Sequence, residues 1–156
     1  MKTILLLVML NLALLATEII KTNTSIDKLR AYKFETPQGV SIKIPKDTKL
    51  IISAFEKDTG ALVNSFLDKK DKNYLSKKQG VYIADIHSMP TIITTLFALP
   101  KLKKYKHLIY LHYEDIFQTV VPNKEGKITI ICLDKHKIKD IFFITTKEEL
   151  EKVIEK

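Results

Sequence analysis

The chain has 156 residues, of which 26 are Lys or Arg and 18 are Asp or Glu, so its formal net charge is +8. This length suits one domain with its own hydrophobic core. A content of 46% hydrophobic and 28% charged residues excludes a disordered or collagen-like chain. The single cysteine excludes an intramolecular disulfide, and no Cys/His spacing is typical of a zinc site.

The N-terminus has the pattern of a secretory signal peptide. Lys2 precedes a mostly apolar run from Ile4 to Ala16, and Ala16 is the expected last residue before cleavage. We predict residues 1–16 to be a signal peptide and the mature protein to be periplasmic or secreted, with no integral membrane span after cleavage. The alternative is an uncleaved N-terminus that anchors the protein to the inner membrane. The run is shorter than the roughly 20 apolar residues of a spanning helix, although Ile19 and Ile20 could extend it.

The positive charge comes almost entirely from lysine, because Arg30 is the only arginine. The lysines are scattered among acidic residues along the chain. Proteins that read nucleic acid favour arginine and often interleave aromatic residues with basic ones. We therefore predict a solvated lysine surface and no nucleic-acid partner, with an anion- or membrane-surface patch as the alternative.

The elements expected first along the chain are an N-terminal extension and a central strand. Residues 17–48 are weakly periodic, but Val40–Ile44 alternates before Pro45, which is typical of an edge strand. The main domain covers residues 49–156. It opens with the nearly continuous apolar run Leu50–Phe55, which predicts a strand covered on both faces.

Two helices and two further strands are expected next. A helix to about Lys70, capped by Asp58 or Thr59, follows from the apolar stripe after Phe55. Val81–Ala84 reads as a buried strand, and a short strand is expected at Leu108–Leu111. Between them, Ser88–Pro90 opens a helix that Pro100 ends or kinks. We expect its inward face to consist of Ile92, Ile93, Leu96 and Phe97.

The C-terminal third predicts a hairpin and a closing helix. Ile128–Leu133 and Ile138–Ile144 are expected to pair in antiparallel fashion across Asp134–Lys137. Thr146 and Glu149 have the spacing of a capping box, followed by the helix stripe Leu150, Val153 and Ile154. The whole order predicts an α/β fold with a mixed sheet flanked by helices.

This order of elements from Lys49 to Lys156 resembles the thioredoxin fold. The resemblance implies that Val121-Pro122 lies near the family's cis-proline and that Phe55–Thr59 stands where thioredoxins carry Cys-x-x-Cys. Both cysteine positions are replaced, by Glu56 and Thr59. Dithiol-disulfide oxidoreductase activity is therefore not expected.

Ile83–Pro90 and Phe97–Leu102, together with the signal peptide, are similar to a group of small exported bacterial proteins labelled FAD/FMN-containing dehydrogenases. A dinucleotide fold needs closely spaced glycines beside the pyrophosphate. The four glycines of this chain, Gly39, Gly60, Gly80 and Gly126, are far apart in sequence. We predict no cofactor, and FAD or FMN bound without a glycine loop remains the alternative.

Polar residues follow several predicted strands, at the sheet edge where open α/β folds usually bind ligands. If they converge, they could bind a metal ion or form an acid/base pair; otherwise they are caps, turn residues and surface ion pairs. The buried Cys132 is expected to be inert, and His107 and His136 are expected to be exposed. We predict no catalytic or metal-ligating residue, and a candidate binding groove of Phe55, Glu56, Asp58, Asp85, His87, Met89 and Pro122.

The function that these observations favour is a redox-inactive, thioredoxin-like module that binds a protein or peptide in the bacterial envelope. The alternative is a flavin- or metal-dependent oxidoreductase.

Overall fold

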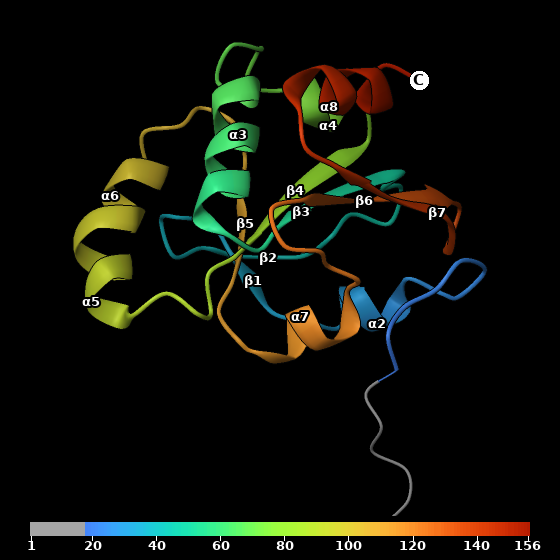
Figure 1. Cartoon of the computed structure of the whole chain (residues 1–156), viewed down its shortest axis with the longest axis horizontal. Coiled ribbons are helices and arrows are strands. Elements are labelled where there is room, and N and C mark those ends of the chain that lie inside the picture. Colours follow the sequence, from blue (N-terminus) through green and yellow to red (C-terminus); the bar gives the residue numbers. More distant parts are fainter. Residues whose placement is uncertain (1–17) are drawn as a thin grey trace, which may run out of the picture.

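The computed structural model describes residues 18–156, which form a seven-stranded mixed sheet with helices on both faces (Figure 1). The strand order is β2-β1-β5-β4-β3-β6-β7. The predicted signal peptide, residues 1–16, lies outside the described residues. Between residues 18 and 156 there is no helix with the length and apolar character needed to cross a bilayer.

The strands are β1 (Phe34–Glu35), β2 (Ser41–Ile42), β3 (Leu50–Ala54), β4 (Gly80–Asp85), β5 (Tyr110–His112), β6 (Ile128–Asp134) and β7 (Lys137–Ile144). The helices are α2 (Asp27–Arg30), α3 (Lys57–Leu67), α4 (Tyr74–Lys77), α5 (Thr91–Ile93), α6 (Leu99–Leu102), α7 (Ile116–Val120) and α8 (Lys147–Ile154), with a π-helical turn at Thr94–Ala98 between α5 and α6.

Strand β3 lies inside the sheet, parallel to its neighbour β4 and antiparallel to β6. Every residue of β3 is buried, which confirms the prediction of a strand covered on both faces. The predicted edge strand is confirmed over Ser41–Ile42, because β2 is the last strand on its side of the sheet. The C-terminal hairpin and its closing helix are also confirmed, and the strands continue to Asp134 and Lys137, which pair across a two-residue turn.

Alternate residues of the strands enter two separate cores, one on each face. Ile52, Tyr82 and Ile130 pack with residues of α3 and α8, whereas Ile51 and Ile83 pack with residues of α2 and α7. Figure 1 shows α3, α4 and α8 on one side of the strands and α2 and α7 on the other. This three-layer arrangement follows from burying both faces of a largely apolar sheet.

The ends of α3 and α8 are fixed by side-chain hydrogen bonds. The prediction that Asp58 or Thr59 caps α3 is wrong, since Glu56 is the capping residue and its backbone N–H donates to Oγ1 of Thr59 at 3.2 Å. The capping box of α8 is confirmed, because the backbone N–H of Glu149 donates to Oγ1 of Thr146 at 3.1 Å. The backbone N–H groups of Thr145 and Thr146 donate to Oε2 of Glu149 at 2.8 and 3.2 Å, and these hydrogen bonds lower the pKa of the Glu149 carboxyl.

The helical segment from α5 to α6 packs against the core with the side opposite to the one that we predict. The predicted inward residues are exposed: 69% of Ile92, 44% of Ile93, 63% of Leu96 and 65% of Phe97. Leu99, Leu102 and Tyr105 pack against the core instead. Both sides of this helix are apolar, so periodicity could not decide which one faces the sheet.

Pro100 does not end this helix, because α6 continues to Leu102. A proline has no N–H to complete a helical hydrogen bond. The π-helical turn just before it adds one residue to the turn, which is a common way to absorb such an irregularity. Further along, Ile116–Val120 forms α7, where we predict no helix or strand. Every peptide bond between residues 18 and 156 is trans, so Val121-Pro122 does not have the cis geometry that the resemblance implies.

Candidate functional site

The carboxyl ends of β4 and β5 bring Asp85, a residue of the predicted groove, close to His112. Asp85 and His112 are register partners on these neighbouring parallel strands, so their side chains leave the same face about 4.8 Å apart along the sheet. Oδ1 of Asp85 lies 3.8 Å from Nδ1 of His112 and 3.0 Å from Nδ1 of His87. The backbone N–H of His87 donates to the same oxygen at 3.2 Å, which folds the chain back over the end of β4.

A glutamine from α7 completes the group, and we call Asp85, His87, His112 and Gln118 the Asp85 cluster. Nε2 of Gln118 lies 2.9 Å from Nε2 of His87. An amide nitrogen can only donate, so Nε2 of His87 accepts and Nδ1 carries the hydrogen that it donates to Asp85. Both ring nitrogens of His87 are therefore engaged within the protein.

The other histidine of the cluster is enclosed. His112 is fully buried, with the rings of Tyr32, Phe34 and Phe117 at 5.6, 5.6 and 4.9 Å between centroids. Neither ring nitrogen has a hydrogen-bond partner among the described residues, and Oδ2 of Asp85 is likewise buried and unpaired. A contact of 3.8 Å is too long for a hydrogen bond.

The unpaired atoms of the Asp85 cluster are therefore all buried, out of reach of a substrate in solution. Proton transfer needs a side chain within hydrogen-bond reach of the reacting atom. Here Asp85 and His112 are buried, and His87 uses both nitrogens inside the protein. Within the part of the chain that the structure describes, no group of three or more His, Cys, Asp or Glu side chains is arranged to hold a metal ion. The cluster ties β4, β5 and α7 together.

The remaining residues of the predicted groove are dispersed around this end of the sheet. Phe55 adjoins the Asp85 cluster, because its ring stacks on Phe117, and Phe117 in turn contacts His112. Glu56 points elsewhere, because its Oε1 accepts from the backbone N–H of Gly126 at 2.9 Å. The other three are exposed Asp58 in the first turn of α3, half-buried Met89 before α5, and half-buried Pro122, whose carbonyl accepts from Thr129.

The lone cysteine lies far from the start of α3. Cys132 on β6 pairs with Leu50, the first residue of β3, whereas α3 follows the last residue, Ala54. Leu50 and Ala54 are four residues apart on β3, which is about 13 Å at about 3.3 Å per residue. Cys132 is half-buried, and burial raises the pKa of its thiol.

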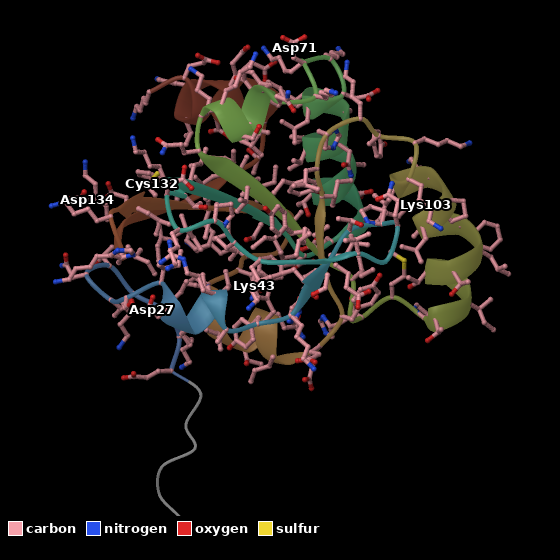
Figure 2. All side chains as sticks on the ribbon, turned by 180° about the vertical axis from the view of Figure 1, so that it is seen from behind. Asp27, Lys43, Asp71, Lys103, Cys132 and Asp134 are labelled. Atoms are coloured by element: carbon pink, nitrogen blue, oxygen red, sulfur yellow. The ribbon has the colours of Figure 1, made fainter. Side chains whose placement is uncertain are left out.

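An exposed apolar surface lies on the helical segment that carries α5 and α6. Ile92, Ile93, Leu96 and Phe97, which we call the 92–97 stripe, are spaced so that successive turns place them on one side. Exposed lysines follow directly, and Figure 2 shows Lys103 at this side of the molecule, with Cys132 across the sheet from it. The four lysines are Lys101, Lys103, Lys104 and Lys106.

We did not predict three structural features from the sequence: the role of Gln118, the burial of His107 and the exposure of the 92–97 stripe. Gln118 sits in a stretch without periodicity, and nothing in the sequence pointed to it. His107 was expected to be exposed but is buried, and its period-two spacing from the buried Ile109 and Leu111 was the available signal. To predict that the 92–97 stripe is exposed, one must know which side of the helix packs against the core.

Comparison with known proteins gives the fold. No family model and no curated protein matches this sequence. Among solved structures, the chain is similar to the bacterioferritin comigratory protein of Xanthomonas campestris, with TM-score 0.55, 6% identity, and 86% of this chain and 96% of that chain covered. A candidate protein disulfide isomerase of Bacteroides thetaiotaomicron gives TM-score 0.52 and 15% identity, covering 90% and 87%. StoA of Bacillus subtilis gives TM-score 0.50 and 15% identity, covering 78% and 93%. The chain has a thioredoxin-like fold.

Proposed function

We propose that this protein is an exported, redox-inactive thioredoxin-like module that binds a protein partner in the bacterial envelope through the 92–97 stripe. The observation that carries the proposal is the exposure of four large apolar side chains on one side of a helix whose other side is packed. Contiguous apolar surface on a soluble protein usually marks an interaction site.

Redox inactivity rests on the position and environment of the sulfur. Two of the similar structures are named for disulfide isomerisation or peroxide reduction. Thiol chemistry at a helix start uses the helix dipole to favour the thiolate. In this chain that position carries Glu56 and Thr59, and the only thiol is that of Cys132, whose pKa is raised by burial. A raised pKa leaves less of the nucleophilic thiolate at neutral pH.

The partner surface is defined by the chemistry around the stripe. Leu96 and Phe97 are the kind of apolar anchor that fills a pocket on a partner, while the exposed lysines that follow favour acidic side chains at the rim. We therefore expect a partner with an apolar groove bordered by Asp or Glu. Its affinity should fall as the salt concentration rises, because rim charges are screened.

Site-specific photo-cross-linking in producing cells tests this proposal. A photoreactive phenylalanine analogue replaces Phe97, and in a matched control it replaces Phe142, an exposed phenylalanine on β7. We expect one cross-linked partner that depends on position 97, identified by mass spectrometry and then shown to bind as purified protein. Equal cross-linking patterns at positions 97 and 142 would contradict the proposal.

The redox half of the proposal is tested separately with the purified chain. Reduction of insulin by dithiothreitol should proceed at the uncatalysed rate, and the Cys132→Ser variant should give the same rate. An acceleration that disappears in Cys132→Ser would show that the lone thiol is redox-active.

A further inference from the structure

Strand β7 ends the sheet on one side, and only part of its outer edge is covered. The N-terminal segment covers the beginning, where the N–H of Ile138 donates to the carbonyl of Thr24 at 2.9 Å and the N–H of Asn23 donates to that of Ile138 at 2.7 Å. At the other end, the N–H of Thr145 donates to Oε2 of Glu149 at 2.8 Å. Between these two points, β7 has no neighbour on its outer side among the strands of residues 18–156.

The backbone of Ile141 and Phe143 points to this open side. Successive residues of an antiparallel strand direct their N–H and C=O groups to opposite sides. Counting back by two from Thr145, whose N–H points outward, gives Phe143 and Ile141. The pairing with β6 agrees, because the N–H of Leu133 donates to Lys49 beside β3. Every second residue of β6 from Leu133 therefore faces β3, and these include the register partners of Ile141 and Phe143. In the described part of the chain, no hydrogen bond reaches their N–H and C=O groups from the open side.

The side chains along this open stretch are apolar and adjoin a groove. Ile141 and Phe143 are half-buried, and Phe142 is 40% exposed. Phe142 lines a groove of about 530 Å³ between β7 and α8, together with Cys132 and Val153. A strand edge with unpaired backbone groups and apolar side chains is a template on which another strand can pair.

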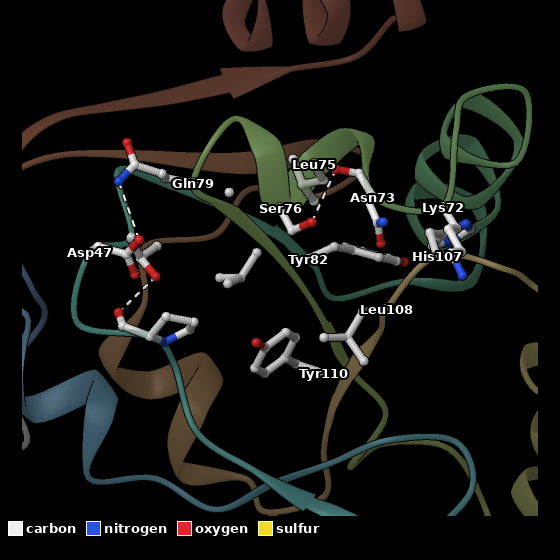
Figure 3. Close-up of a pocket in the computed structure, with 14 residues that line it drawn as sticks. Asp47, Lys72, Asn73, Leu75, Ser76, Gln79, Tyr82, His107, Leu108 and Tyr110 are labelled. Carbon is white, nitrogen blue, oxygen red and sulfur yellow. Dashed lines mark hydrogen bonds between the residues drawn. The ribbon is translucent and has the colours of Figure 1, made fainter.

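A second cavity, of about 350 Å³, lies beside the amino end of β4, and Figure 3 shows Tyr82, Leu108 and Tyr110 on its lining. It offers no place for an added strand, because β4 has β3 on one side and β5 on the other. The groove at β7, in contrast, borders the last strand of the sheet, where an added strand meets no neighbour.

We propose that two copies of this protein pair through their β7 strands, antiparallel to each other, around a two-fold axis at Phe142. Ile141 of each copy then lies opposite Phe143 of the other, and their outward N–H and C=O groups exchange hydrogen bonds across the axis. Phe142 lies opposite its own counterpart as a non-hydrogen-bonded pair, with Cα atoms about 4.5 Å apart. Aromatic cross-strand pairs of this kind stabilise a sheet, and the two rings meet at the mouths of the two grooves.

The charges of the groove favour a second copy over an unrelated strand. Five charged residues line it: Lys139, Lys152, Lys156, Asp140 and Glu149. The carboxylate of Glu149 is held by the capping box of α8, and none of the other four forms an ion pair within residues 18–156. In the two-fold arrangement, Asp140 of each copy lies opposite Ile144 of the other, which lines the same groove as Lys152. Each copy thus brings an unpaired carboxylate to the unpaired lysines of the other.

Sedimentation velocity of the purified protein tests the inference, because the dimer fraction rises with protein concentration. We expect dimers to form at concentrations up to about 1 mM. Phe142→Ser should weaken the dimer by at least about 25-fold, since an interface anchor typically accounts for about fivefold or more and a two-fold dimer loses it twice. Val40→Ser changes an exposed apolar residue next to β2, at the other end of the sheet, and should dimerise like the wild type.

Cysteine substitutions in a Cys132→Ser background test the register of the two strands. Phe142→Cys places two thiols directly opposite each other, within the Cα separation of about 4.4–6.8 Å that a disulfide spans. Lys139→Cys places them six residues apart along the ladder, about 20 Å at about 3.3 Å per residue. On mild oxidation, Phe142→Cys should give a disulfide-linked dimer, and Lys139→Cys should not.

This surface is separate from the 92–97 stripe, because Figure 1 shows β7 and the segment of α5 and α6 on opposite sides of the molecule. The inference goes beyond the proposed binding of a protein partner and does not depend on it, so cross-linking at Phe97 can succeed or fail independently. A protein that stays monomeric up to about 1 mM would overturn the inference. A dimer that Phe142→Ser leaves unchanged would also overturn it, as would a dimer that Leu96→Ser abolishes, since the copies would then meet through another surface.

Discussion

Acidification should weaken the fold through His107, and the size of the effect follows from its burial. Burial lowers the pKa of His107 from the ordinary 6.5 to about 4. Below pH 6.5 the unfolded chain therefore binds a proton at this position that the folded chain does not bind. The contribution of His107 to stability is fully present above pH 6.5, falls as the pH is lowered, and becomes constant below about pH 4.

The magnitude can be worked out for a change from pH 7.5 to pH 5. The two pKa values give an upper limit of about 2 kcal/mol for the loss at pH 5, and we expect a measured loss of about 1–2 kcal/mol. Urea unfolding of the wild type and of His107→Gln at both pH values isolates the effect. Glutamine does not titrate, so its variant should lose about 1–2 kcal/mol less on acidification, whatever its stability at pH 7.5. Equal losses in the two proteins would refute the reasoning.

Four further predictions concern stability and cofactor binding. Thr146→Ala should lower the free energy of unfolding in urea by about 1 kcal/mol, since it removes the N-cap acceptor of α8; an unchanged midpoint would show that the cap is dispensable. Asp85→Asn should cost about 1–3 kcal/mol, because it disrupts the buried acceptor of His87, and a neutral result would mean that the Asp85 cluster does not hold β4 to α7. Leu96→Ser should change stability by less than about 0.5 kcal/mol, whereas Ile52→Ala should cost about 2–5 kcal/mol, and a large loss in Leu96→Ser would mean that the stripe is packed. Mixing the protein with FMN or FAD should leave flavin fluorescence unchanged, since the four glycines are far apart in sequence, and saturable quenching would favour the oxidoreductase alternative.

The sheet was predictable because its strands follow simple burial rules. Leu50–Ala54 is apolar at almost every position, and in the structure it is buried on both faces between two neighbouring strands, β4 and β6. The capping box at Thr146 and Glu149 marked the start of α8 through local chemistry alone. Such signals depend on the neighbours of each residue in sequence, so a single chain carries them.

The orientation of the 92–97 segment could not be predicted in this way. Leu96 and Leu99 lie on different sides of a helix that is apolar on both, and the choice between them depends on which side the core can accommodate. The π-helical turn at Thr94–Ala98 also shifts the phase of the helix in the middle of the segment.

The candidate site was predictable only where strand register decides contacts. Asp85 and His112 each end a parallel strand, so their proximity follows from the sheet. The partner of His87, Gln118, comes from a helix with no sequence pattern, and it is this residue that occupies the second ring nitrogen. Whether a histidine is free for chemistry depends on such tertiary contacts, and the sequence does not contain that information in readable form.

The central claim, that the 92–97 stripe is the partner-binding surface, is tested most directly by the affinity of the purified cross-linked partner for three versions of the full-length protein. Isothermal titration should give an affinity for Leu96→Ser at least about fivefold weaker than for the wild type, because a buried anchor residue typically contributes more than about 1 kcal/mol to binding. Phe142→Ser, which changes an exposed aromatic residue on β7, should bind like the wild type. Equal affinities for the wild type and Leu96→Ser would contradict the claim.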